Sequence, residues 1–137
     1  MRGDQRPLWR DPDTGYVREQ ISSVPTNTAR GDRNPEITRV TLPPDARVPF
    51  PSDAFYFISQ AIWVLQGTLH FVEWGHVHQL EKDDCLTLGD PTDCVFENRS
   101  DLPCIYVVVV TWRRHRPKMM RPLYFVLCIS RSHDVLS

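Results

Sequence analysis

The stretch that decides the fold is Gln60-Ala-Ile-Trp-Val-Leu-Gln-Gly-Thr-Leu-His-Phe71. It contains two short runs rich in branched and aromatic residues, and such runs predict β-strands. Gly67 separates them and can adopt the positive φ angle of a tight turn, so the stretch predicts a β-hairpin. Both faces of the first run are largely apolar, which predicts cover on both sides. Gln60 is the exception, because an inward amide needs hydrogen-bond partners, and it is a first indication of a lined pocket.

Similar apolar runs recur about every ten residues on both sides of this stretch. No segment shows helical periodicity over three turns, so we predict an all-β domain, either a sandwich or a barrel. Alternation directs Leu69, Phe71, Leu80, Leu86, Leu88 and Phe96 inward, and we expect Thr68, His70, Glu73, Glu81 and Thr87 on the other face. The further expected strands are Tyr16 to Val24, Glu36 to Leu42, His76 to Leu80, Asp84 to Leu88, Cys94 to Asn98 and Cys104 to Trp112.

The length and charge of the chain limit the kinds of protein that it could be. Its 137 residues suit one domain, and a net charge of -1 gives no overall attraction to nucleic acid or anionic lipid. We see no signal peptide and no apolar segment long enough to span a membrane, so we expect a cytoplasmic protein with no membrane partner. We divide the chain into an extended N-terminal arm (1–15), a β-barrel (16–114) and an irregular C-terminal tail (115–137).

Cysteines and histidines are the obvious candidates for reactive or metal-binding groups. Cys85, Cys94, Cys104 and Cys128 match neither a paired zinc motif nor a Cys-x-x-Cys redox motif, so we interpret them as small apolar residues. Cys94 could instead be a reactive thiol, but no Lys or Arg near it in sequence would lower its pKa. The cluster of His70, His76 and His78 suggests a metal site, although surface or rim histidines explain it more simply.

Two stretches resemble the motifs of the cupin superfamily. Residues 60–69 resemble the end of the first cupin motif, and residues 84–98 resemble the second. With Trp9-Arg-Asp-Pro-Asp-Thr-Gly-Tyr-Val-Arg18, the chain is most similar to the C-terminal cupin sensor domains of helix-turn-helix regulators of the xenobiotic-response-element type. The resemblance covers roughly residues 9 to 114 and implies a single-domain jelly-roll β-barrel.

The resemblance also locates the positions of the family's metal ligands. The His-x-His pair falls on Asp53 and Phe55 or on Ala54 and Tyr56, the Glu position holds Gln60, and the second His position holds Cys94. An amide and one thiol make a poor site for a borderline divalent cation. We therefore expect no bound metal, no cofactor and no catalytic residues.

The interior positions could form a pocket for a small organic ligand. Gln60 could contact a ligand or be satisfied by the barrel itself, and the aromatic residues could line a pocket or simply fill the interior. The residues that we assign to the pocket are Tyr56, Gln60, Ile62, Phe71, Leu86, Cys94 and Phe96.

Three functions are compatible with these patterns. The first is a metal-free ligand-binding sensor domain related to transcriptional regulation. Only about fifteen residues precede the first expected strand, so we expect no helix-turn-helix and no sequence-specific DNA binding by this chain. The second is a metal-dependent cupin enzyme, such as a dioxygenase or isomerase, with unusual ligands. The third is a structural dimerisation barrel, since the outward Trp63 and Leu65 suit a homodimer contact.

Overall fold

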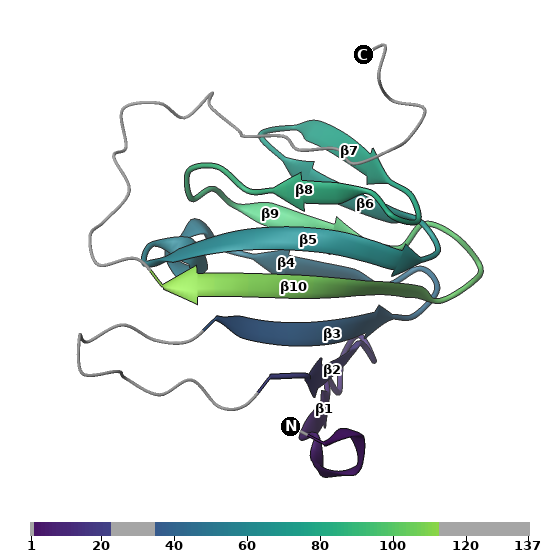
Figure 1. The fold of residues 1–137 in the computed structure, drawn as a ribbon. Helices are drawn as coiled ribbons and strands as arrows, with labels where there is room; N and C mark the ends of the chain where they lie inside the picture. Colours follow the sequence, from purple (N-terminus) through teal and green to yellow (C-terminus); the bar gives the residue numbers. More distant parts are fainter. Residues whose placement is uncertain (1, 23–34, 113–137) are drawn as a thin grey trace, which may run out of the picture.

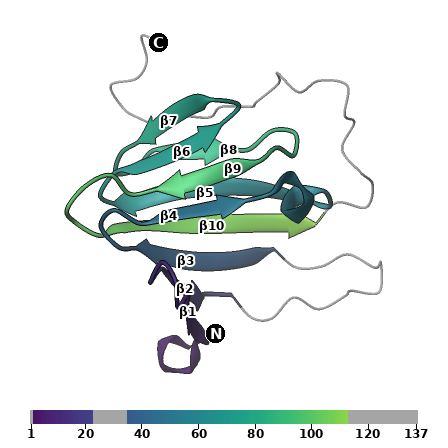
Figure 2. The same ribbon diagram turned by 180° about the vertical axis from the view of Figure 1, so that it is seen from behind.

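The computed structural model describes residues 2–22 and 35–112. Two antiparallel β-sheets pack face to face and enclose the core, as the two opposite views in Figures 1 and 2 show. The described residues form strands and two short 3-10 helices, η1 (Gly3–Gln5) and η2 (Ser52–Phe55), which confirms the all-β prediction. Cys128, the last two residues of the expected first strand and the expected C-terminal tail lie outside the described residues. No described helix is long and apolar enough to cross a membrane.

The larger sheet has six strands and carries most of the residues around the candidate site. Its long central pair, β5 and β10, is antiparallel over eight paired positions from Ile105↔Gln66 to Trp112↔Ile58. The strand β1 lies inside the segment that we expected to be an extended arm, and it pairs with β2 at the sheet edge. The order is β1 (Leu8–Arg10), β2 (Val17–Gln20), β3 (Glu36–Leu42), β10 (Cys104–Trp112), β5 (Ile58–Gln66) and β8 (Cys85–Thr87).

The smaller sheet has four strands and closes the other side of the interior. Its order is β4 (Arg47–Phe50), β9 (Cys94–Glu97), β6 (Leu69–Glu73) and β7 (His76–Leu80). The strand β4 was not predicted, because Pro49 cannot donate a backbone hydrogen bond and argues against a strand. Within the sheet β4 pairs only with β9, so Pro49 occupies the edge position where a proline is tolerated.

The predicted hairpin at Gly67 is wrong. Gly67 does have a positive φ of 80°, but β5 belongs to the six-stranded sheet and β6 to the four-stranded sheet. The turn therefore carries the chain across the interior from one sheet to the other, as sandwich corners do. Ile62 and Val64 consequently face Leu69 and Phe71 from opposite walls, and all four side chains are fully buried.

The inward positions form one core, and five of the six predicted core residues are buried, with Leu88 packed against them. Glu73 departs from our expectation that it faces outward. It shares the alternation of Leu69 and Phe71 on β6, so its side chain also points inward and is only 2% exposed. His78 on β7 is also partly buried, with its ring stacked on Phe71 at 6.1 Å between centroids. Both residues lie on the β6–β7 pair, on the side of the four-stranded sheet away from β4.

Candidate functional site: a cavity between the two sheets

A cavity of about 330 Å³ lies between the inner faces of the two sheets. This volume is at the small end of the range that small-molecule sites occupy. One wall comes from β2, β3, β10 and β5, and the other from β4, η2 and β9. The lining residues are Tyr16, Arg18, Glu36, Thr38, Val40, Val48, Phe50, Ala54, Phe55, Ile58, Gln60, Phe96, Tyr106, Val108, Val110 and Trp112.

Aromatic rings link the two walls of the cavity. Phe50 contacts Phe55 at 6.2 Å and Phe96 at 5.5 Å between ring centroids. Phe96 in turn stacks on Tyr106 of the opposite sheet, with centroids 5.6 Å apart and planes 11° apart. The position of η2 beside these rings is fixed by a hydrogen bond in which the backbone N–H of Ser52 donates to Oδ1 of Asp93 at 2.7 Å. This wall is apolar and offers flat surfaces to a ligand.

A row of polar side chains lies at one end of the opposite wall. Val110 on β10 is flanked in register by Glu36 of β3 and Gln60 of β5. The backbone of Gln60 is fixed because its carbonyl accepts a hydrogen bond from the N–H of Leu88 at 2.9 Å. Its side-chain Oε1 is enclosed and has no hydrogen-bond partner among the described residues. An enclosed amide oxygen without a partner costs free energy, so it favours the arrival of a hydrogen-bond donor.

Arg18 lies farther along the same wall, next to two tyrosines. It is level with Val40 of β3, which in turn is level with Tyr106 of β10. The positive charge of its guanidinium opposes the rise that burial causes in the pKa of Tyr16. Burial raises the pKa of Tyr106 well above its ordinary value. Both phenols are therefore neutral at physiological pH and can donate hydrogen bonds.

The structure brings only part of the predicted pocket set to the cavity. Gln60 and Phe96 line it. Tyr56 follows η2 without lining the cavity, while the other four residues are buried in the core: Ile62, Phe71, Leu86 and Cys94. A ligand role for any of the seven stays a prediction.

Sequence reasoning missed several cavity residues that a simple signal could have identified. Continuing the alternation of β3 backwards from Leu42 leads to Val40, Thr38 and Glu36, all on the inner face. The same rule along β10 leads from Cys104 to Trp112 through Tyr106, Val108 and Val110. Arg18 has no such signal, because its place depends on the pairing of β2 with β3.

The positions of the cupin metal ligands do not fit a divalent cation. Gln60 supplies a neutral amide, the side chains of Ala54 and Phe55 carry no donor atom for a metal, and Asp53 and Tyr56 do not line the cavity. Cys94 is 3% exposed, and burial raises the pKa of its thiol to about 12, so it is protonated at neutral pH. A thiol binds a metal as the thiolate, and an amide oxygen is a weak ligand. Within the described ranges, no three His, Cys, Asp or Glu residues form a group that could hold a metal ion.

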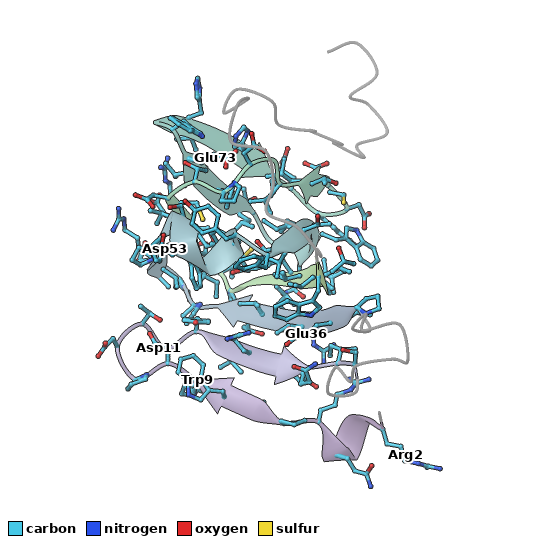
Figure 3. The ribbon with its side chains drawn as sticks, turned by 90° about the vertical axis from the view of Figure 1, so that its left-hand side faces the viewer. Arg2, Trp9, Asp11, Glu36, Asp53 and Glu73 are labelled. Atoms are coloured by element: carbon cyan, nitrogen blue, oxygen red, sulfur yellow. The ribbon has the colours of Figure 1, made fainter. Side chains whose placement is uncertain are left out.

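Glu73, whose carboxyl group also points inward, belongs to a different part of the molecule than Glu36. In the side view of Figure 3, Glu73 lies near one end of the two-sheet structure and Glu36 lies well away from it, toward the β1–β2 end. Glu73 does not line the main cavity. Its carboxyl group therefore cannot act together with Glu36 on one small ligand.

Comparison with solved structures assigns this architecture to a known fold. The cupin_2 domain of an XRE family transcriptional regulator from Enterobacter cloacae aligns with a TM-score of 0.61 and 14% identity, over 72% of this chain and 98% of that one. An HTH_3 family transcriptional regulator from Vibrio cholerae also aligns with a TM-score of 0.61, at 15% identity, over 75% of this chain and 55% of the regulator. A predicted oxalate decarboxylase from Thermotoga maritima aligns with a TM-score of 0.60 and 15% identity, over 81% of this chain and 96% of that one.

These likenesses define the fold and not the activity. The chain has the cupin jelly-roll fold, as the two sequence motifs predicted. No protein-family model matches the chain. No curated protein matches it either. Because regulators and a predicted decarboxylase share the fold, function has to be argued from the cavity itself.

Proposed function

We propose that this chain is a metal-free ligand-binding module that takes a small organic molecule into the cavity between its sheets, as the sensor domain of a regulatory system. The observation that carries this proposal is the enclosed Oε1 of Gln60, which finds no hydrogen-bond partner in the described part of the chain, at the wall of a cavity of about 330 Å³. Apolar walls with a few convergent polar groups are typical of small-molecule sites. The XRE and HTH_3 regulators that share the fold support a sensor role.

The test is a thermal-shift screen of the full chain with small metabolites, because a ligand that binds only the folded state raises the melting temperature. Val108→Phe places a ring into the cavity and should abolish the shift. Val77→Phe is the matched control, since Val77 is an exposed valine on β7 that does not line the cavity. A ligand whose shift survives Val108→Phe, or a library that never shifts the wild type, would refute the proposal.

The enzyme alternative rests on the predicted oxalate decarboxylase that shares the fold. It requires a metal or an acid–base pair at the cavity. The amide of Gln60 and the protonated thiol of Cys94 are unsuited to a metal site, so we propose no catalytic residues and no cofactor. Elemental analysis of protein purified without a histidine tag is the discriminating measurement, and stoichiometric iron, manganese, nickel or zinc would favour the enzyme.

The partners of the module are also proposals. The outer face of β5 and β10 carries Trp63, which is 45% exposed, beside the half-buried Ile105, Val107 and Val109. An apolar strip of this kind suits a homodimer contact in which the same face meets its copy. We propose no sequence-specific DNA binding by this chain, and a salt-resistant, operator-selective gel shift would contradict that.

A further inference from the structure

We infer that the cavity takes an elongated zwitterion, with an ammonium group at one end, a carboxylate at the other and an apolar segment between them. The inference rests on the proposed ligand-binding function and adds the chemical class of the ligand. It is carried by the positions of Glu36, Gln60 and Arg18 on one wall.

The first end of the cavity presents hydrogen-bond acceptors. Glu36 and Gln60 flank Val110 on its two sides, so their Cα atoms are about 10 Å apart across three strands. Their side chains line the same space, and the described residues supply no ion-pair or hydrogen-bond partner for the carboxylate of Glu36. A carboxylate and an amide oxygen without a donor together favour a ligand group with several N–H donors and a positive charge.

The second end presents hydrogen-bond donors. Arg18 is level with Val40, four residues along β3 from Glu36, which corresponds to about 13 Å along the strand. Its guanidinium and the neutral phenol of Tyr16 border the cavity, and no carboxylate of the described residues forms an ion pair with Arg18. Arginine binds carboxylates through two parallel hydrogen bonds, so this end favours an anionic oxygen group.

Glu36 and Arg18 line one cavity without forming an ion pair with each other. Elsewhere on the same strands, Arg39 lies on the outer face and is paired at 2.7 Å with Glu19. The surface between the two ends is mainly apolar, with Val108 on one wall and Val48 and Phe96 on the other. A ligand with a single charge would therefore leave either Glu36 or Arg18 without an oppositely charged group in the ligand. A zwitterion with an apolar spacer satisfies both.

The experiment compares three probes of equal chain length by calorimetric titration of the full chain: ω-aminooctanoate, octanoate and octylamine. We expect the zwitterion to bind about tenfold more tightly than either singly charged probe, the effect of one charge-assisted contact. Glu36→Gln should reduce the preference for ω-aminooctanoate over octanoate to about one. Arg18→Gln should reduce the preference for ω-aminooctanoate over octylamine to about one. Arg39→Gln and Glu97→Gln alter outward residues of the same types and should leave both ratios unchanged.

The outcomes separate this inference from the proposed function. A wild type that binds ω-aminooctanoate no better than octanoate or octylamine overturns the zwitterion, as does a preference that survives Glu36→Gln and Arg18→Gln. If octanoate or octylamine then binds and Val108→Phe abolishes that binding, the proposed ligand-binding function is supported. Only the inference that the ligand is a zwitterion is then wrong. If none of the three probes binds, the zwitterion is overturned, and the metabolite screen decides the proposed function separately.

Discussion

The Nε2 atom of His78 lies 3.3 Å from Oε1 of Glu73 inside the structure. The other carboxylate oxygen of Glu73, Oε2, is enclosed and has no hydrogen-bond partner among the described residues. Burial raises the pKa of Glu73 to about 7, and burial together with the nearby His76 lowers the pKa of His78. Although the two groups are close enough for an ion pair, desolvation favours the neutral form of both. Near pH 7 the Glu73 carboxyl is therefore about half protonated, next to a neutral imidazole.

The raised pKa of Glu73 predicts that the protein loses stability as pH rises from the acid range to neutrality. The folded state holds the Glu73 proton up to about pH 7, whereas an unfolded chain releases it near pH 4.5. The free energy of unfolding should therefore fall as pH rises from 4.5 through 7, by about 3 kcal/mol in total. The lowered pKa of His78 acts in the opposite direction and removes stability as pH falls below 6.5.

Urea unfolding of wild type and Glu73→Gln between pH 4.5 and 8.5 measures the effect. Glutamine carries no titrating proton, so the stability of the variant relative to wild type should rise through this range. Asp101→Asn changes an exposed carboxylate and serves as the control. Parallel pH profiles for wild type and Glu73→Gln would show that Glu73 is ionised inside the fold.

The two turn glycines should differ in their response to alanine. Gly67 and Gly75 both have positive φ angles, 80° and 73°. A Cβ on Gly67 would lie 2.8 Å from the carbonyl oxygen of Pro103, whereas a Cβ on Gly75 would meet nothing within 4 Å. Gly75→Ala should lower the unfolding free energy by about 1 kcal/mol through backbone strain alone. Gly67→Ala should lower it by about 2 kcal/mol more, because backbone atoms must move. Equal denaturation midpoints for the two variants would disprove this difference.

The apolar outer strip predicts a concentration-dependent mass. If Trp63 lies in a homodimer contact, light scattering at micromolar concentration should give twice the 16.0 kDa of one chain. Trp63→Lys should shift the mass to that of a monomer, because a charge on each copy would be buried in the contact. Trp74→Lys is a suitable control, since Trp74 is similarly exposed but lies at the turn between β6 and β7. A monomeric wild type would contradict the proposal.

Strand positions were more predictable from sequence than the connections between strands. The bounds Glu36–Leu42, His76–Leu80 and Cys104–Trp112 are those predicted, because apolar runs bordered by turn residues mark them clearly. The strand β1 was missed because its three residues are all exposed and show no alternation. The prediction of a hairpin at Gly67 was wrong. A glycine turn indicates that the chain reverses direction, but it does not show whether the next strand joins the same sheet.

The cavity was less predictable than the fold. Gln60 was identified because a polar residue interrupts an apolar face. Arg18 was not identified, because its place beside Val40 depends on the register of β2 against β3. Glu36 was missed although the alternation along β3 leads to it. Inward-pointing Glu73 could have been recognised from its alternation with Phe71.

Asn98 predicts a further pH-dependent effect at the end of β9. Its Nδ2 donates hydrogen bonds to the carbonyls of Leu42 at 2.9 Å and Leu102 at 2.7 Å, and its Oδ1 accepts from the N–H and hydroxyl of Ser100. The residue is 1% exposed and joins β3 to the loop before β10. Asn98→Asp replaces the double donor with an oxygen that faces two carbonyls, so stability at pH 7 should fall by about 3 kcal/mol.

The size of that loss should depend on pH in a defined direction. A carboxyl facing two carbonyl oxygens binds a proton more tightly when folded, so the pKa of the introduced aspartate rises and the penalty should shrink as pH falls toward 4. Ser100→Ala is the milder comparison, since it removes one hydroxyl and should cost about 1 kcal/mol at every pH. Urea denaturation at pH 4, 5.5 and 7 measures both variants against wild type. A penalty for Asn98→Asp that stays constant over this range would mean that Asn98 does not hold the loop through its two donor hydrogens.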